Sequence, residues 1–332
     1  MNCNENDNKE YNKDSFLCSV CIPTYNRADM LKKTLQAFID TDSFRKGKVE
    51  LVISDNASED NTYEICKCFQ QEHPDKIQYL RHEKGIDPHL NFKFSLDHGR
   101  GKYLKLNNDH VYFLQNEFDN FISILEKNQE QYDFVFFTGY DKNNETFVSL
   151  ETLDALIQSI SYFITSINLL CIRKDIYKFV QDPFRAWKSC LPQTDLCLRL
   201  FASGSKGLLT PHLKFHEQQI IYGTNRNEAK IFGRNYIGML HSYYKEKKIS
   251  RKIYQREKRR VLVNHIFVFH FDFFHQYTAH QKIPPFWRYM GYYKKDLFFY
   301  AVLVWIAFYY FTTNIIPIHQ MLGKIKRGLL KN

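Results

Sequence analysis

The 332-residue chain lacks a cysteine arrangement that could hold a metal ion or form a disulfide framework. Of its eight cysteines, Cys18 and Cys21 fall three residues apart in an apolar run typical of a strand, where they point to opposite faces. Cys66 and Cys68 fall in a helical pattern, about 200° apart around the helix axis. We therefore expect the cysteines to be small, buried, apolar side chains in a protein of a reducing compartment.

The N-terminus lacks the apolar segment of a secretory signal peptide. Residues 1–14 are rich in Asn, Asp, Glu and Lys, a composition that is typical of disorder. We interpret them as a disordered tail and expect the folded chain to begin at residue 15.

Acidic side chains are scarce in the last third of the chain. From Arg226 to the end there are 20 Lys and Arg against 5 Asp and Glu, which leaves 26 against 31 before it. The net charge of +10 is thus the sum of −5 for the residues before Arg226 and +15 for the residues from Arg226 onward. This asymmetry indicates a polyanionic partner, either nucleic acid or an anionic membrane face. Because no nucleic-acid-binding module is recognisable, we expect a membrane surface and no nucleic acid.

Apolar strands alternate with helical patterns over the first 115 residues. The apolar runs, typical of buried parallel strands, lie at residues 16–22, 49–54, 77–80 and 103–106. Helical spacing follows at residues 30–39, 62–71 and 90–96. This alternation predicts an α/β fold with a Rossmann-like, mostly parallel sheet flanked by helices. Ligands of such sheets bind at the carboxyl ends of the strands.

Three polar clusters follow these strands. They are Pro23-Thr24-Tyr25-Asn26-Arg27, residues 55–60, and Asn107-Asn108-Asp109-His110. Taken singly, each has an ordinary structural interpretation: a strand-to-helix turn, an Asx turn with a helix cap, and a polar turn. The third cluster has one carboxylate, Asp109, which is well placed to hold a divalent cation against a phosphate.

Together, in this order and spacing, the three clusters resemble the family 2 glycosyltransferases of the GT-A fold. The resemblance covers roughly residues 16–115. Within the family, the chain is most similar to the bacterial transferases that build lipopolysaccharide O-antigen and capsule chains. In that family a nucleotide-sugar lies across the carboxyl ends of the strands, and a metal bridges its diphosphate. The resemblance implies an inverting, hexosyltransferase-type enzyme of surface polysaccharide biosynthesis.

The resemblance also implies a donor site. The residues that would bind the nucleotide-sugar are Pro23, Thr24, Tyr25, Arg27, Asp55, Asn56, Gly85, Asp87 and Asn108. Among these, Asp55 and Asn56 would hydrogen-bond the base, and Asn108 would contact the ribose. Gly85 and Asp87 would belong to a loop that closes over the nucleotide.

The implied metal site departs from the family pattern. Relatives often have two or three consecutive acids, whereas here Asp109 stands alone at that place. We expect Asp109, His110 and His216 as ligands of Mn²⁺ or Mg²⁺, with the imidazoles favouring Mn²⁺. One carboxylate holds a hard cation poorly unless the diphosphate supplies further oxygens. The alternative is therefore a metal-independent or catalytically degenerate relative, acting as a nucleotide-binding scaffold in a membrane polysaccharide assembly complex.

Asp195 is the candidate catalytic base. It begins the pattern Asp-x-x-Leu-Arg-Leu, which resembles the segment where family members place an acid at the start of a helix. An inverting transfer needs a carboxylate that takes the proton of the acceptor hydroxyl. The structural alternative for Asp195 is a helix N-cap.

The C-terminal third predicts helices and contact with a membrane. Residues 297–318 form a 22-residue stretch without a formal charge, long enough to span a bilayer. Its Tyr and Trp content favours a helix that lies in the interface or re-enters the same face, and packing on the protein is the other alternative. Lysines flank the stretch on both sides, so orientation is not defined.

The predicted organisation has four parts: a disordered tail (1–14), a GT-A catalytic domain (15–220), a helical basic region (221–283) and a hydrophobic membrane-associating segment (284–332). The expected partners are a nucleotide-sugar donor, a saccharide or polyprenyl-linked glycan acceptor and the inner-membrane surface. The expected location is the cytoplasmic face of that membrane, with peripheral or monotopic attachment.

Overall fold

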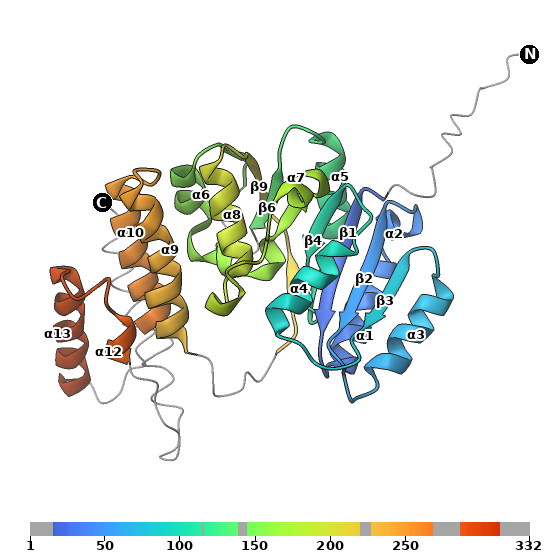
Figure 1. The fold of residues 1–332 in the computed structure, drawn as a ribbon, viewed down its shortest axis with the longest axis horizontal. Helices are drawn as coiled ribbons and strands as arrows, with labels where there is room; N and C mark the ends of the chain where they lie inside the picture. The colour runs from blue at the N-terminus through green and yellow to red at the C-terminus, as the bar shows by residue number, and fades with distance from the viewer. Residues whose placement is uncertain (1–15, 115, 139–144, 220–226, 268–285, 313–332) are drawn as a thin grey trace, which may run out of the picture. The chain divides into compact units, whose positions relative to one another are not determined.

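The computed structural model describes residues 16–114, 116–138, 145–219, 227–267 and 286–312 (Figure 1). The chain divides into two compact units. We call them the sheet unit (residues up to 149, 166–184 and 205–219) and the helical unit (residues 150–165, 185–204 and from 220 onward). The predicted tail, residues 1–14, lies outside the described residues.

The sheet unit contains an eight-stranded sheet of order β3-β2-β1-β4-β8-β6-β9-β7. Its strands are β1 (Cys18–Thr24), β2 (Val49–Asp55), β3 (Ile77–Arg81), β4 (Tyr103–Leu106), β6 (Phe134–Thr138), β7 (Val148–Leu150), β8 (Cys171–Arg173) and β9 (Gly207–His212). Strands β3, β2, β1 and β4 are parallel, as are β6 and β9, whereas β8 runs antiparallel to β4 and β6. A separate antiparallel pair joins β5 (Val111–Phe113) to β10 (Phe215–Glu217).

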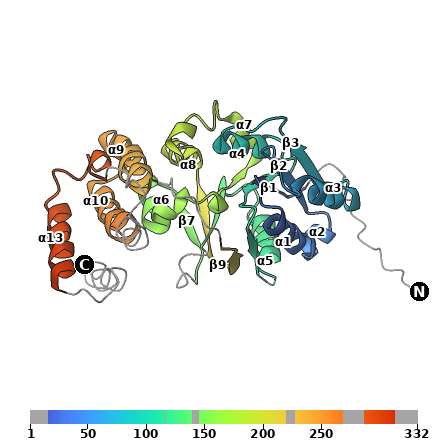
Figure 2. The same cartoon turned by 90° about the horizontal axis from the view of Figure 1, so that it is seen from below.

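The apolar runs form the centre of this sheet. Every residue of β1, β2 and β4 is buried, as expected of parallel strands that are covered on both faces. Figure 2 shows α1 and α5 on one face of the sheet, and α4 and α7 on the other. The helices of this unit are α1 (Ala28–Ile39), α2 (Asp42–Arg45), α3 (Thr62–Glu72), α4 (Pro88–Asp97), α5 (Glu117–Lys127), the short η2 (Ile167–Leu169) and α7 (Lys174–Phe179). The predicted strands and helices of the first 115 residues are confirmed.

Helix α1 illustrates how the pattern determines the packing. Leu31, Leu35 and Phe38 repeat at i, i+4 and i+7 and are all buried in the main core cluster. The Phe38 ring packs edge-on against Phe118 of α5, with ring centroids 4.8 Å apart. This packing holds α1 against α5, while the hydrogen bond from the Ala28 N–H to Asp60 holds its start.

The described part of the helical unit is built mainly from helices. They are α6 (Leu153–Ile160), η1 (Ser161–Thr165), η3 (Trp187–Ser189), α8 (Pro192–Ala202), η4 (Ala229–Tyr236), α9 (Ile237–Lys245), α10 (Arg251–Val261), η5 (Leu262–Ile266), α12 (Phe286–Tyr289) and α13 (Leu297–Thr312). Three of them, η1, η4 and α10, meet at a buried carboxylate. Glu257 of α10 accepts hydrogen bonds of 2.9 Å from Ser161 and Tyr236. Burial raises the pKa of Glu257 to about 7.

Helix α13 covers the first part of the predicted membrane segment. It ends at Thr312, and residues 313–318 of that segment lie outside the described part of the chain. Across the described ranges, we find no helix with both the length and the apolar character that crossing a bilayer requires. The predicted domain boundaries stay predictions, and the two compact units alternate along the chain, because residues 150–165 and 185–204 group with the helical unit.

Candidate active site

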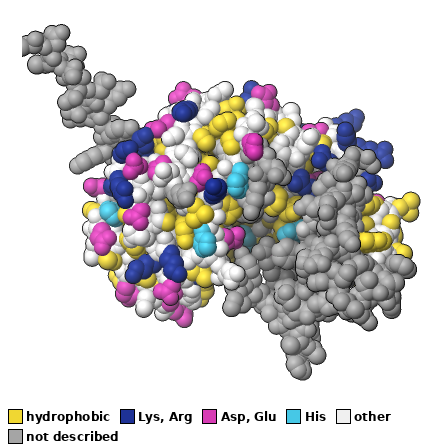
Figure 3. All heavy atoms as spheres, turned by 180° about the vertical axis from the view of Figure 1, so that it is seen from behind, with side chains coloured by type: hydrophobic (Ala, Val, Ile, Leu, Met, Phe, Trp, Pro, Cys, Tyr) yellow, Lys and Arg dark blue, Asp and Glu magenta, His cyan; other side chains and the backbone are white. Residues whose placement is uncertain are grey.

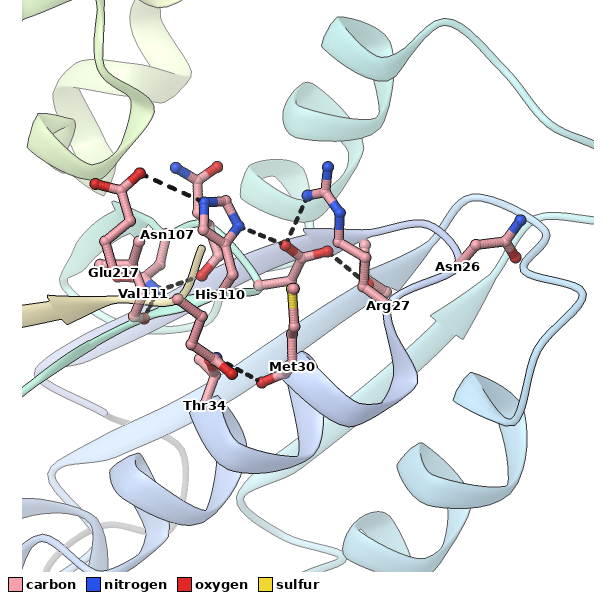
Figure 4. A network of polar contacts seen from close by, with 12 residues as sticks. Asn26, Arg27, Met30, Thr34, Asn107, His110, Val111 and Glu217 are labelled. Carbon is pink, nitrogen blue, oxygen red and sulfur yellow. Dashed lines mark hydrogen bonds and ion pairs between the residues drawn. The ribbon is translucent and has the colours of Figure 1, made fainter. Parts of the chain in front are cut away.

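Asp109 lies at the centre of a polar network in the sheet unit, and Figure 4 shows its partners Arg27 and His110. Its Oδ2 accepts a hydrogen bond from Thr24 Oγ1 (2.8 Å). Its Oδ1 lies 2.9 Å from both Arg27 Nη1 and His110 Nδ1. The Asp109 side chain is 2% exposed, and the Arg27 side chain is 37% exposed. The structure therefore brings four of the predicted site residues into direct contact.

Strand register explains this meeting. Strands β1 and β4 are parallel neighbours, and Cys21 lies opposite Leu106. Thr24 and Asp109 each come three residues later, so both follow their strands to the same edge of the sheet. The turn after Thr24 then places Arg27 just before α1, over the same carboxylate.

His110 links Asp109 to an acid that the sequence did not indicate. Its Nε2 lies 3.7 Å from Glu217 Oε1, and this nitrogen is buried without a hydrogen-bond partner in the described part of the chain. Burial disfavours the charged imidazole, but the hydrogen bond to Asp109 and the nearby Glu217 carboxylate outweigh it and raise the pKa of His110 above its ordinary value. The edge thus combines the Arg27 guanidinium and the His110 imidazole with two carboxylates.

Glu217 reaches this position through β10, which pairs with β5 so that Glu217 lies opposite Val111, the residue after His110. His216 is the neighbour of Glu217 in that strand and points to the other face of the pair. Its ring centroid is 5.2 Å from that of Tyr112. No local sequence signal predicts this pairing, since β5 and β10 are about 100 residues apart.

The side chains of the predicted metal ligands do not form a metal site by themselves. In the part of the chain that the structure describes, no group of three His, Cys, Asp or Glu side chains could hold a metal ion. Both oxygens of Asp109 already face N–H or O–H donors of the protein. A divalent cation therefore fits here only if a bound diphosphate supplies most of its oxygen ligands.

The first and second polar clusters are hydrogen-bonded to each other. The backbone N–H of Asn26 donates to Ser58 Oγ (2.9 Å), and that of Ala28 donates to Asp60 Oδ2 (2.9 Å). Asp60 thus caps the first turn of α1 from a different loop. Ala57 adopts a positive φ of 62°, which is costly for a residue with a Cβ atom, whereas Asn26, with φ of 50°, is of a type that tolerates this region.

Asp55 and Asn56 hold protein groups in place. Asp55 is fully buried and accepts a 2.6 Å hydrogen bond from the Tyr79 hydroxyl. The Asn56 side chain pairs with the backbone of Ile86, donating to its carbonyl (2.9 Å) and accepting from its N–H (2.8 Å). Asn56 therefore ties the predicted nucleotide loop, Gly85 to Asp87, to the end of β2.

The remaining predicted donor residues differ in exposure. Pro23 is buried in β1, Tyr25 is 51% exposed, and Asn108 is partly exposed. Asp87 caps α4 by accepting a 2.9 Å hydrogen bond from the His89 N–H. Tyr25 carries the aromatic ring of this set, and its exposure leaves that ring available for stacking.

A buried lysine supports the loop that carries Asp109. Lys105 Nζ donates to Asn107 Oδ1 (3.2 Å) and to the Asn168 carbonyl (3.0 Å). Asn168 Oδ1 in turn accepts from the Asn108 N–H (2.8 Å). We did not predict either residue, although the sequence contains a signal for both: a lysine inside an apolar strand, and an asparagine inside the apolar run 164–172.

Asp195 lies in the first turn of α8, in the helical unit. Its two oxygens accept hydrogen bonds from Arg185, at 2.9 Å from Nε and 3.1 Å from Nη2. The Asp195 side chain is 11% exposed, and the N-cap residue of α8 is Leu191, so Asp195 is not the N-cap. The bidentate pair holds the carboxylate in one orientation. The role of Arg185 was not predicted, because no pattern in the sequence between Arg185 and Asp195 indicates that the two side chains meet.

The comparisons with known proteins agree with this architecture. Residues 19–186, just over half of the chain, match the family model Glycosyl transferase family 2. An 88-residue segment is 36% identical to abequosyltransferase RfbV of Salmonella typhimurium, over 26% of this chain and 26% of that protein. A 183-residue segment is 25% identical to the minor teichoic acid biosynthesis protein GgaB of Bacillus subtilis, over 52% of this chain and 19% of that protein. The chain thus spans about a quarter or less of the length of these relatives.

Two solved structures share the fold. The mannosyltransferase PcManGT from Pyrobaculum calidifontis, in complex with GDP-Man and Mn²⁺, matches with a TM-score of 0.55 at 13% identity, over 95% of this chain and 86% of that one. S. aureus TarS 1–349 in complex with UDP-GlcNAc matches with a TM-score of 0.52 at 14% identity, over 76% and 73%. At such identities the likeness shows the fold alone. The predicted GT-A architecture, a mostly parallel sheet flanked by helices, is confirmed.

Proposed function

The chain belongs to glycosyl transferase family 2, and we propose that it is an inverting glycosyltransferase of surface polysaccharide biosynthesis. In this proposal it moves a sugar from a nucleotide-sugar to a saccharide acceptor that is linked to a polyprenyl lipid. The observation that carries the proposal is the meeting of Thr24, Arg27, Asp109 and His110 where β1 and β4 end. Parallel α/β sheets bind nucleotides at such an edge.

Arg27 is the proposed contact for the diphosphate of the donor. Its Nη1 donates a hydrogen bond to Asp109. The side chain is 37% exposed, so its other N–H groups can donate to phosphate oxygens. The Asp109 carboxylate orients Arg27, and His110 adds a second positive charge as it becomes protonated. In this proposal both cations stabilise the negative charge that develops on the departing diphosphate.

The other donor contacts follow from the arrangement of the loops. The half-exposed Tyr25 ring stacks on the base, and the loop from Gly85 to Asp87 closes over the nucleotide. Asn56 contributes by holding that loop through Ile86. The side chains of Asp55 and Asn56 already form hydrogen bonds within the protein. In this proposal, backbone groups of the surrounding loops therefore form the hydrogen bonds to the base.

Asp195 is the proposed base. It accepts the proton of the acceptor hydroxyl while that oxygen attacks the anomeric carbon and the bond to the diphosphate breaks. Arg185 keeps the carboxylate oriented for this step. Bound Mn²⁺ or Mg²⁺ would supply additional neutralisation of the diphosphate, with Asp109 as its protein ligand.

The acceptor and the location are part of the same proposal. A polyprenyl-linked acceptor lies in the inner membrane, and the last third of the chain carries 20 Lys and Arg against 5 Asp and Glu. Such a charge excess favours attachment to an anionic membrane face. We therefore place the enzyme at the cytoplasmic side, attached peripherally or monotopically through residues 284–332.

The test is sugar transfer by the purified full chain with a panel of nucleotide-sugars, in Mn²⁺, in Mg²⁺ and in a chelator. We expect Asp109→Asn and Asp195→Asn each to lower transfer at least about a hundredfold, the usual size of a general-base or charge-stabilisation effect. Asp75→Asn is the matched control, since Asp75 is exposed and outside the network. Unchanged transfer in both site variants would contradict the mechanism.

The alternative, a nucleotide-binding scaffold without transferase activity, is favoured by one observation. Asp109 stands without a second acid and both of its oxygens are engaged by protein donors. A scaffold would show donor-dependent thermal stabilisation but neither transfer nor donor hydrolysis with any metal. Turnover of any nucleotide-sugar that depends on Asp109 excludes this alternative.

A further inference from the structure

A basic groove lies between α10 and the segment that leads into α13, within the helical unit. Its volume is about 850 Å³, which is within the range of ligand-binding sites. Its charged lining comprises five cations and one carboxylate: Arg251, Lys252, Lys258, Arg259, Lys295 and Asp296. The groove therefore has a strong excess of positive charge.

Among the described residues, carboxylates neutralise only part of this charge. Lys258 is buried, and its Nζ lies 3.2 Å from Asp296 Oδ2. The other four cations are exposed, and no carboxylate of the described residues lies within ion-pair distance of them. The Arg259 guanidinium is held 5.0 Å above the Phe298 ring, which orients it without reducing its charge. Four positive groups are thus available to an anionic partner.

Exposed apolar side chains continue from the groove along α13. Leu297 lines the groove and is 85% exposed, and Val304 is 69% exposed. Leu297, Tyr300 and Val304 are spaced i, i+3 and i+7, so they lie on one face of the helix. Figure 3 shows hydrophobic side chains gathered where α13 lies, next to Lys and Arg side chains. A cationic groove and an apolar stripe on one surface are the two features of a membrane-surface helix.

We propose that this groove and the exposed face of α13 form a binding site for the surface of an anionic membrane. Arg251, Lys252, Arg259 and Lys295 contact lipid phosphate groups, while Leu297 and Val304 enter the boundary of the acyl chains. The inference rests on the proposed function, because a lipid-linked acceptor requires the enzyme at a membrane. Nucleic acid would match the charge, but it would leave the apolar face of α13 in water.

The charge of the groove is tested by co-sedimentation of the full chain with vesicles. One set contains phosphatidylcholine alone, and the other contains phosphatidylcholine and phosphatidylglycerol in equal parts. We expect binding to the anionic vesicles, weakened by salt. The triple variant Lys252→Gln, Arg259→Gln, Lys295→Gln should bind roughly a hundredfold more weakly, about fivefold for each charge near the surface. The control with the same charge change is Lys32→Gln, Lys33→Gln, Lys46→Gln, three exposed lysines of the sheet unit, and it should bind like the unmodified chain.

The apolar face is tested by single substitutions. Leu297→Ser should weaken vesicle binding roughly tenfold, the loss expected when one leucine side chain no longer enters the lipid. Phe179→Ser is the matched control, since Phe179 is 89% exposed but belongs to the sheet unit. Retained thermal stabilisation by nucleotides would show that each variant is folded.

Three results would overturn the inference: equal binding to both vesicle types, equal loss in the triple variant and its control, or saturation of the groove by an oligonucleotide or inorganic pyrophosphate without vesicle binding. Sugar transfer separates this failure from that of the proposed function. Transfer to a water-soluble acceptor without vesicle binding would refute the membrane site alone. Vesicle binding without turnover of any donor would refute the transferase proposal and leave the site intact.

Discussion

Replacing Lys105 by Met is expected to change how the stability of the protein depends on pH. Lys105 is fully buried in β4, where its ammonium group contacts three oxygens and the ring of Phe137 (4.9 Å to the centroid). No carboxylate forms an ion pair with it among the described residues. Burial lowers the pKa of Lys105 from 10.5 to about 8.

The magnitude follows from this difference in pKa. The unfolded chain binds the lysine proton more tightly than the folded chain does, so stability rises as the pH passes from about 8 toward 10.5. At about 1.4 kcal/mol per pH unit, the buried charge lowers the free energy of unfolding by about 3 kcal/mol at neutral pH. About 2 kcal/mol of that returns between roughly pH 7 and pH 9.5.

Methionine has a similar length and no charge, so the free energy of unfolding of Lys105→Met should not show this rise with pH. At neutral pH the substitution removes the cost of the buried charge, but it deprives Asn107 and Asn168 of a hydrogen-bond donor, at about 1–3 kcal/mol for each unsatisfied oxygen. These two effects nearly cancel, so the informative quantity is the pH dependence of the difference in stability.

The assay is urea unfolding, followed by circular dichroism over that pH range, of the unmodified chain, Lys105→Met and Lys32→Met. Lys32 is an exposed residue of α1 and serves as the control. The stability difference between the unmodified chain and Lys105→Met should change by about 2 kcal/mol, while the difference for the control stays constant. A constant difference for Lys105→Met would refute the reasoning.

Three further predictions concern the site and the helical unit. Because the pKa of His110 is raised above 6.5, the unmodified chain should lose stability as the pH rises through that raised value, and His110→Gln should lose this dependence in the same assay. Glu257 has its pKa raised to about 7, so stability should fall as the pH rises from about 4.5 to 7. Glu257→Gln, which still accepts the two hydroxyl hydrogen bonds, should be more stable by up to about 3 kcal/mol above that range, and equal stability would contradict the assignment. Asn56→Ala removes both hydrogen bonds to Ile86 and should weaken nucleotide binding roughly tenfold in calorimetry, whereas unchanged affinity would show that the loop needs no such anchor.

The first four strands of the sheet and their helices could be predicted from the sequence, because the signal for each is local. A continuous apolar run is typical of a strand buried on both faces, and β1, β2 and β4 are buried along their whole length. Leu31, Leu35 and Phe38 follow helical spacing and face the core as expected. The same local reasoning placed Thr24 and Asp109 at the carboxyl ends of two buried strands, and the structure shows that these strands are neighbours.

Contacts between distant segments could not be predicted in this way. Glu217 meets His110 only because β10 pairs with β5, and Arg185 meets Asp195 only through the fold of the loop before α8. Strand β8 runs antiparallel between β4 and β6, although its sequence is an ordinary apolar run. Such pairings depend on packing energies summed over many residues, which no short segment of the sequence contains.

Asp109 shows where the two kinds of information separate. The sequence by itself determined that a lone carboxylate follows a buried strand. Tertiary structure decided that its two oxygens face Thr24, Arg27 and His110, and that Lys105 and Asn168 hold the loop beneath it. The reason is physical: a strand signal is carried by neighbouring residues, whereas the partners of a buried charge are chosen by the register and packing of the whole sheet.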